Sequence, residues 1–199
     1  MNGTLYFGGS FNPPHLAHVA CSAAAARAAG LGGVILVPTG RPNLKDVADV
    51  APPEHRVAMT HLAAANAGSD VLFAVDDLEI GRPGTTYTFD TVETLAARGV
   101  RPVNWLIGAD QLLNLHRWHR FEELLETARL WVMARPGYVI DWNTVHPAVE
   151  ALRDDVVTVP QLDVSATEIR RRLRAGESTD GLLHPAVRAY CDEHRLYGE

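Results

Sequence analysis

The chain has 199 residues, with 47% hydrophobic and 21% charged side chains, and its formal net charge is −6. These values are typical of a globular protein with a full core, and they exclude an overall positive field that would attract nucleic acid. The two cysteines, Cys21 and Cys191, lack CxxC spacing, and no signal-peptide pattern or membrane-length apolar run is present. We therefore expect a soluble cytoplasmic protein that binds neither nucleic acid nor a membrane.

Short apolar runs alternate with helical patterns along the chain, which predicts an α/β fold: a Rossmann-like, doubly wound parallel sheet with helices on both faces. In such folds ligands bind beyond the carboxyl ends of the strands, where the strand order reverses. We expect a single domain over 1–199, with a C-terminal helical part from about 163 to 199 packed on it. The expected strands are 4–7, 34–37, 71–75, 103–107, 130–134 and 156–159. The expected helices are 15–29, 53–65, 89–97, 121–128, 144–152, 165–175 and 185–194.

The most informative stretch is 8–18, which reads GGSFNPPHLAH and follows the first expected strand. The glycine pair allows a ligand to approach the main chain, and the prolines suit the first turn of a helix, whose free N–H groups favour an anion. His15 and His18 then lie on one helix face, where two imidazoles can donate hydrogen bonds to a phosphate. A plain turn with surface histidines and a metal-binding histidine pair remain alternatives.

Two common phosphate-binding patterns are absent from the chain, namely GxxxxGK[ST] and GxGxxG. The segment 9–18 instead resembles the HxGH nucleotidyltransferase superfamily, whose first strand ends in G-[ST]-F-[DN]-P before the histidine pair. The sequence departs from this pattern at Ala17, where the family usually has glycine. The resemblance implies that His15 and His18 are catalytic and that ATP contacts Gly8, Gly9, Ser10 and Phe11.

A second motif lies at 164–170, which reads VSATEIR. Ser165 and Glu168 have the spacing of a capping box, so they predict a helix start, with Thr167 and Arg170 on one face near its positive end. A hydroxyl and a guanidinium there would suit a triphosphate, and a capped helix with solvated arginines is the alternative. The motif resembles the ISSTxxR segment of the same superfamily, with alanine for the second serine. The resemblance implies that Arg170 is catalytic and that Ser165 and Thr167 bind ATP.

The middle of the chain resembles bacterial nicotinate-mononucleotide adenylyltransferases in three strings: PGTTYTFDT at 83–91, LIGAD at 106–110 with Trp118 downstream, and RPG at 135–137. The resemblance implies that Gly108 and Asp110 contact the adenosine part of ATP. It also implies that the nicotinate nucleotide is bound by Thr88, Phe89, Trp118 and His119, with Trp118 stacked on the pyridine ring. The plain alternatives are a core position for Trp118 and helix caps at Asp110 and Thr88.

Two departures lie on the pyridine-nucleotide side of the family's site. The segment 42–45 reads PNLK where the family usually has P-P-H-[KR], so Leu44 replaces an imidazole while Lys45 keeps a catalytic cation. His119 stands where tyrosine is common. The surrounding stretch 39–52 is either a lid or a long connection.

The resemblance implies adenylyl transfer from ATP to nicotinate mononucleotide, which gives deamido-NAD and pyrophosphate in NAD biosynthesis. Mg²⁺ is also expected as a cofactor. We expect it to be bound mainly by the phosphate oxygens of ATP, because the sequence shows no carboxylate cluster that would hold it. A sister enzyme that uses nicotinamide mononucleotide or another phosphorylated acceptor is the alternative. A nucleotide sensor without turnover is a further one.

Overall fold

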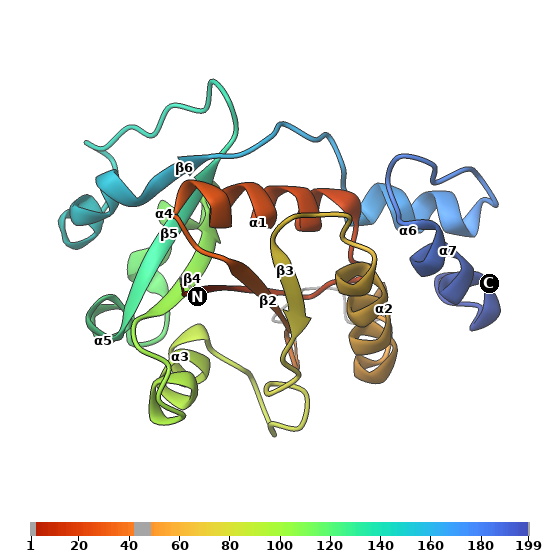
Figure 1. The fold of residues 1–199 in the computed structure, drawn as a ribbon, viewed down its shortest axis with the longest axis horizontal. Coiled ribbons are helices and arrows are strands. Elements are labelled where there is room, and N and C mark those ends of the chain that lie inside the picture. The colour runs from red at the N-terminus through yellow and green to blue at the C-terminus, as the bar shows by residue number, and fades with distance from the viewer. Residues whose placement is uncertain (1–2, 42–48, 199) are drawn as a thin grey trace.

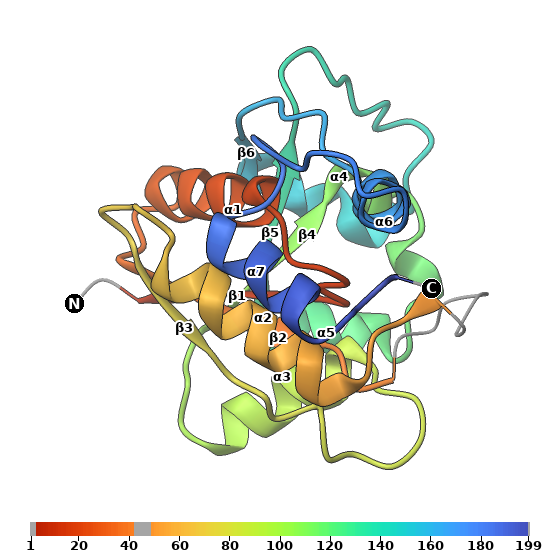
Figure 2. The ribbon, with the colours of Figure 1, turned by 90° about the vertical axis from the view of Figure 1, so that its right-hand side faces the viewer.

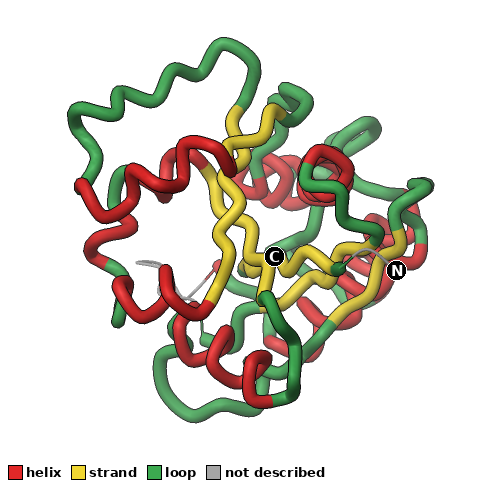
Figure 3. Tube along the Cα trace, turned by 60° about the vertical axis from the view of Figure 1, so that its left-hand side comes forward, coloured by secondary structure: helices red, strands yellow, loops and turns green. Residues whose placement is uncertain are grey.

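A computed structural model of the chain describes residues 3–41 and 49–198. Six parallel strands form one sheet in the order β3-β2-β1-β4-β5-β6, with helices around it (Figures 1 and 3). The doubly wound parallel sheet predicted from the sequence is thereby confirmed. The strands are β1 (Thr4–Gly9), β2 (Gly33–Pro38), β3 (Leu72–Val75), β4 (Val103–Gly108), β5 (Ala128–Ala134) and β6 (Val156–Thr158).

The helices follow the expected pattern closely, and none within the described residues is long and apolar enough to cross a membrane. Two short elements, α4 and η2, were not predicted, because three or four residues are too few to show helical periodicity. The expected α-helix at 144–152 is wrong in type: the structure has a 3-10 helix that begins at Pro147. The helices are α1 (Leu16–Ala28), α2 (Pro53–Ala65), α3 (Thr88–Ala97), α4 (Ala109–Leu112), η2 (Leu115–Arg117), α5 (Phe121–Thr127), η3 (Pro147–Asp155), α6 (Ala166–Arg174) and α7 (Pro185–Glu193).

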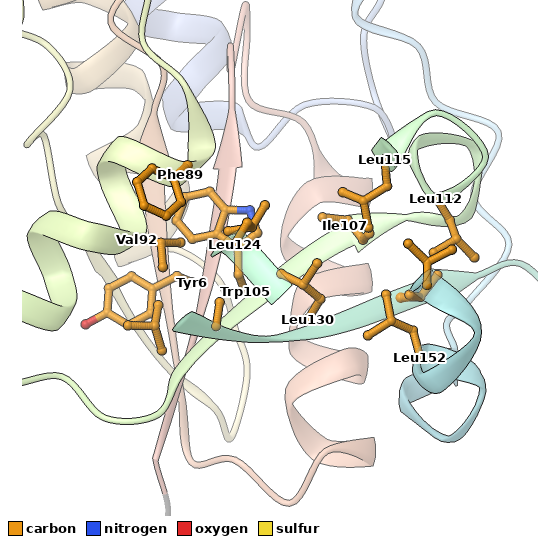
Figure 4. Packing of buried hydrophobic residues seen from close by; sticks show 14 of the residues in the cluster. Tyr6, Phe89, Val92, Trp105, Ile107, Leu112, Leu115, Leu124, Leu130 and Leu152 are labelled. Atoms are coloured by element: carbon orange, nitrogen blue, oxygen red, sulfur yellow. The ribbon is translucent and has the colours of Figure 1, made fainter. Parts of the chain in front are cut away.

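The alternation of side chains along β1 divides the core into two layers. Leu5 and Phe7 pack with the alanines of α1 on one face of the sheet, because successive side chains of a strand point to opposite faces. Tyr6 packs on the other face with Trp105 and Phe89 (Figure 4). Helices therefore cover both faces, and the strand order reverses between β1 and β4, which is where such sheets bind ligands.

The C-terminal helices pack beside α1 and α2 through a third apolar cluster. Met59 of α2 and Ile169 of α6 are fully buried in it, together with Val187 of α7. Figures 1 and 2 show α7 lying against α2, with α6 close to the same end of the molecule. The N–H of Leu16 also donates to the carbonyl of Leu182 at 3.0 Å, so the start of α1 is tied to this layer.

Candidate active site

The turn after β1 is held by packing and by an unusual backbone conformation. A Cβ on Gly8 would meet the Trp105 indole at 2.6 Å, and one on Gly9 would meet the Phe11 ring at 3.1 Å. Core aromatic side chains therefore account for both glycines, while their contact with ATP stays a prediction. Phe11 has φ +45° in the left-handed region, and its ring is buried. Any contact that Phe11 makes with a nucleotide thus comes from its backbone.

His15 and His18 form a stacked pair at the start of α1. Their ring centroids are 3.6 Å apart with an interplanar angle of 17°. The backbone N–H of His15 donates to Nδ1 of His18 at 3.1 Å, which places the ring proton of a neutral His18 on Nε2. Parallel ring planes and an occupied Nδ1 do not converge on one metal ion, so the zinc-pair alternative is not supported.

Burial keeps both imidazoles neutral in the ligand-free protein. It lowers the pKa of His15 from 6.5 to about 4, and it lowers the pKa of His18 well below its usual value, with the neighbouring His15 adding to the effect. Nδ1 of His15 is buried without a hydrogen-bond partner among the described residues. Such a group is satisfied when a ligand reaches it. The pair is therefore arranged as neutral hydrogen-bond donors and not as a preformed cationic site.

A cavity of about 430 Å³ opens at the point where the strand order reverses. It brings together predicted residues from distant parts of the sequence: His15 and His18 from α1, and Gly108 and Asp110 from the end of β4. Ala17 also lines it, as expected for the position that is usually glycine. The remaining lining residues are Phe7, Cys21, Ala109, Met133, Arg135, Tyr138, Val159, Pro160, Leu162 and Val164.

Gly108 and Asp110 have different roles in the local structure. Gly108 is the N-cap of α4, and its N–H donates to the side chain of Gln111 at 2.8 Å. Asp110 lies inside the first turn of α4 and is exposed at the cavity. The helix-cap alternative for Asp110 is therefore wrong, and its carboxylate is available to a ligand.

The second motif starts α6, but without the predicted capping box. Ser165 is the N-cap and makes no side-chain cap hydrogen bond. Glu168 instead accepts hydrogen bonds from Arg171 and Arg172, since two guanidinium partners outcompete a backbone N–H for the carboxylate. These ion pairs lower the pKa of Glu168 to about 2. The Ser165 hydroxyl is left at the open start of the helix, where an anion is favoured.

Arg170 joins the two motifs physically. Its Nη1 donates to the main-chain carbonyl of Asn12 at 3.0 Å, and its Nη2 reaches the Thr167 hydroxyl at 3.4 Å. Nε of Arg170 is buried and has no partner among the described residues. The guanidinium thus lies beside the turn that follows β1, and its buried Nε–H has no partner in the described part of the chain, so the alternative of a solvated arginine does not apply to Arg170.

The residues expected to bind the acceptor lie around the start of α3 and the end of η2. Thr88 is the first residue of α3, whose N-cap is Tyr87, so the cap alternative for Thr88 is wrong. Phe89 is buried, with the Arg120 guanidinium 4.0 Å from its ring centroid. Trp118 follows η2 and packs against the core while staying partly exposed. The exposed His119 ring lies 4.5 Å from that of Tyr87, also exposed.

Some residues fall outside the description or outside the sequence-based prediction. Lys45 and Leu44 are not among the described residues. The sequence analysis did not assign a role to Arg135, which lines the cavity, or to the buried Arg56. Arg56 follows Glu54 and His55 in the chain, so nothing in the local sequence marked it as a buried position.

Mg²⁺ is the group that adenylyl transfer calls for. The described residues contain no cluster of three or more His, Cys, Asp or Glu that could hold a metal ion. An Mg²⁺ ion carried by the phosphate oxygens of ATP needs few protein ligands, and its use by this chain stays a prediction.

Comparison with known proteins agrees with this geometry. The family described as cytidylyltransferase-like matches residues 6–172. A protein of Roseiflexus sp. (strain RS-1), named a probable nicotinate-nucleotide adenylyltransferase, is 36% identical over 192 residues, which cover 96% of this chain and 95% of the relative. The chain belongs to the nicotinate-nucleotide adenylyltransferase family.

Further members of this adenylyltransferase family support the assignment. A probable nicotinate-nucleotide adenylyltransferase of Yersinia enterocolitica is 38% identical, covering 98% of this chain and 96% of the relative. Among solved structures, the nicotinic acid mononucleotide adenylyltransferase of Plasmodium falciparum complexed with NaAD superposes with a TM-score of 0.77 at 20% identity, over 99% of this chain and 98% of that one. At this identity the superposition shows the fold alone.

Proposed function

We propose that this chain transfers the adenylyl group of ATP to nicotinate mononucleotide, which gives deamido-NAD and pyrophosphate in NAD biosynthesis. The observation that carries the proposal is the cavity at the β1–β4 switch point, where His15, His18, Gly108 and Asp110 meet in a member of this family. A cavity of this size at this place suits a nucleotide.

The reaction requires no protein nucleophile. A phosphate oxygen of the mononucleotide attacks the α-phosphorus of ATP, and the bond from that phosphorus to the oxygen leading to the β-phosphate breaks. The electron pair leaves with pyrophosphate. Because the attacking phosphate is already an oxyanion, no proton has to be removed, and catalysis consists of positioning and charge stabilisation.

The chain's own residues supply that stabilisation. His15 and His18, which line the cavity, would contact the reacting phosphates, with Nε2–H of His18 as one hydrogen-bond donor. Negative charge brought beside these imidazoles raises their pKa values and favours the protonated form. Arg170, whose guanidinium lies beside the turn after β1, holds the departing pyrophosphate together with Ser165 and Thr167 at the start of α6. Lys45 provides a further cation.

On the nucleoside sides, Gly108 and Asp110 hold the adenosine part, and the backbone of Gly8, Gly9, Ser10 and Phe11 approaches the phosphates. Thr88 and the backbone of Phe89 hold the nicotinate group, with Trp118 stacked on the pyridine ring and His119 beside it. Mg²⁺, carried on the phosphates of ATP, would neutralise charge on the triphosphate.

The proposal is tested by pyrophosphate release from ATP and Mg²⁺ with nicotinate mononucleotide, nicotinamide mononucleotide or no acceptor. Strong preference for the acid supports the proposal. Equal rates with acid and amide indicate a dual-specificity enzyme and contradict an acid-specific site. ATP binding without release for either acceptor contradicts the proposal in favour of another acceptor or a sensor.

A further inference from the structure

Arg56 of α2 is the largest wholly buried side chain of the described structure, with an exposed fraction of 0%. Its three hydrogen bonds within the described residues all go to main-chain carbonyls, and no carboxylate of these residues forms an ion pair with it. Burial lowers its pKa from the usual range. The carboxylates of Glu54 and Glu79 act on the guanidinium electrostatically without forming an ion pair among the described residues. A buried guanidinium is costly unless its donors are satisfied, so the three carbonyls are the contacts that hold it in place.

The three carbonyls come from separate segments around the proposed phosphate site. Nη1 donates to Ser10 at 2.9 Å, Nη2 donates to Gly40 at 2.9 Å, and Nε donates to Ala51 at 3.1 Å. Ser10 lies in the turn after β1, whereas Gly40 and Ala51 lie on either side of residues 42–48 in the chain. One planar guanidinium thus fixes three backbone positions through three separate nitrogens, a geometry that the single nitrogen of a lysine ammonium does not reproduce.

The contact with Ser10 leads directly to the histidine pair. The next residue, Phe11, is held at φ +45°, a conformation that costs a bulky residue free energy and persists only where its surroundings enforce it. The Phe11 ring packs edge-on against the His18 ring, with centroids 5.1 Å apart. The bond from Arg56 to Ser10 therefore constrains the turn that orients His18.

The contact with Gly40 leads to the proposed acceptor side. The N–H of Gly40 lies 3.4 Å from a carboxylate oxygen of the buried Glu79, whose other oxygen accepts from the Thr91 hydroxyl of α3 at 2.7 Å. Gly40 is thus held through its carbonyl by Arg56 and through its N–H by Glu79. A Cβ on Gly40 would collide with the main chain of Glu79. The network connects Arg56 to the helix that begins at Thr88.

We propose that Arg56 is a positioning residue for adenylyl transfer: it sets the backbone of the turn after β1 relative to Gly40 and Ala51, and so orients His18 and the phosphates of ATP. This inference rests on the proposed function for the identity of the reaction. It assigns Arg56 no contact with a reacting atom.

The test compares Arg56→Lys with the wild-type protein in kcat, in the Kd for ATP measured by calorimetry, and in melting temperature. Lysine keeps the charge but replaces the three nitrogens of the guanidinium with one, so the turn is held less firmly. We expect kcat to fall by about tenfold to 100-fold, because displacements of about 1 Å at reacting groups have effects of this size. We also expect the Kd for ATP to rise.

Met59→Ala is the matched control, because Met59 is equally buried on the same helix and packs against Cys191 in the third apolar cluster, without a hydrogen bond to the turn after β1 among the described residues. It should lower the melting temperature while kcat and the Kd for ATP stay within about twofold of wild type, assayed well below the melting point. A second variant, Arg56→Ala, should recover kcat when guanidinium ion at millimolar concentration is added, whereas the same concentration of sodium chloride should not restore it.

Two outcomes overturn the inference. One is an Arg56→Lys protein with wild-type kcat and Kd for ATP. The other is a Met59→Ala protein that loses kcat as strongly as the Arg56 variants, which would make the effect one of stability alone. Failure of the proposed function gives a different result, because the wild-type protein itself would then release no pyrophosphate. The Kd for ATP could still be compared between the Arg56→Lys and wild-type proteins.

Discussion

At the scale of single residues, the stacked histidine pair is the most specific feature of the site. The two rings lie 3.6 Å apart and are held by a hydrogen bond from the His15 N–H to the His18 ring. Burial keeps both neutral in the absence of ligand. Their chemistry therefore depends on the ligand, whose phosphates supply the negative charge that makes protonation favourable.

Replacing His18 should abolish most of the activity. We expect His18→Ala to lower kcat by about 100-fold or more, the usual cost of removing a donor that stabilises developing charge in a transition state. Steady-state pyrophosphate release measures the effect. His61→Ala is the control, because His61 is an exposed residue of the neighbouring helix α2. Near-normal turnover in His18→Ala would contradict the assigned role.

The depressed pKa of His15 predicts a pH dependence of stability. Between about pH 6.5 and pH 4 the unfolded chain binds a proton at this histidine that the folded protein does not, because burial lowers the folded pKa from 6.5 to about 4. The free energy of unfolding therefore falls as the pH drops through this window, by up to about 3 kcal/mol from His15 alone.

Denaturant titrations at several pH values within that window measure this slope. His15→Gln lacks the titrating group, so its free energy of unfolding should depend less on pH than that of the wild-type protein. An unchanged slope in His15→Gln would mean that His15 does not titrate with a depressed pKa.

At the scale of elements, α6 connects the C-terminal motif with the turn after β1. The Arg170 side chain crosses to the Asn12 carbonyl, and the Asn12 side chain in turn accepts from the Ala51 N–H and from the hydroxyl of Tyr197. The start of α6 is also free of the serine cap that its sequence predicted. An unsatisfied helix start next to the Arg170 guanidinium is suited to an anion.

Arg170→Ala should reduce kcat/KM for ATP by about 100-fold or more, because it removes a charge-assisted contact to the proposed triphosphate site. Arg172→Ala on the same helix is the matched control. Arg172 pairs with the half-exposed Glu168 at 2.9 Å, and such surface pairs contribute little. Equal losses in the two variants would show that general positive charge, and not the position of Arg170, matters.

The sequence predicted helices and strands well where the apolar pattern extends over many residues. It predicted them poorly where an element is only three or four residues long, or where several side chains compete for one hydrogen-bond partner. All six strands were predicted within two residues of their observed ends, since buried parallel strands are continuous apolar runs. The capping box failed because Arg171 and Arg172 take the Glu168 carboxylate. The elements α4 and η2 were missed, although both carry or adjoin predicted site residues. The helix α4 follows β4 and contains Asp110, and η2 directly precedes Trp118.

At the scale of the whole molecule, the fold gathers residues that are separated by most of the chain. The cavity at the strand-order reversal draws on α1, the end of β4 and the segment after β6. The hydroxyl of Tyr197 donates to the Asn12 side chain at 2.7 Å, so the last residues of the chain support the first motif. The two phosphate-site motifs, at 8–18 and 164–170, and their order in the chain could be predicted from the sequence. The supporting contacts of Arg56, Asn12 and Tyr197 could not, because they arise only from tertiary packing.

The most direct test of the central claim follows the α-phosphorus of ATP. The account predicts that, with nicotinate mononucleotide and Mg²⁺, label placed in the α-phosphate appears in a dinucleotide, while label in the γ-phosphate appears in pyrophosphate. This result requires cleavage between the α- and β-phosphates. Label from the γ-phosphate in inorganic phosphate, with no labelled dinucleotide from the α-position, would contradict the account, because ATP would then be hydrolysed and not used for adenylyl transfer.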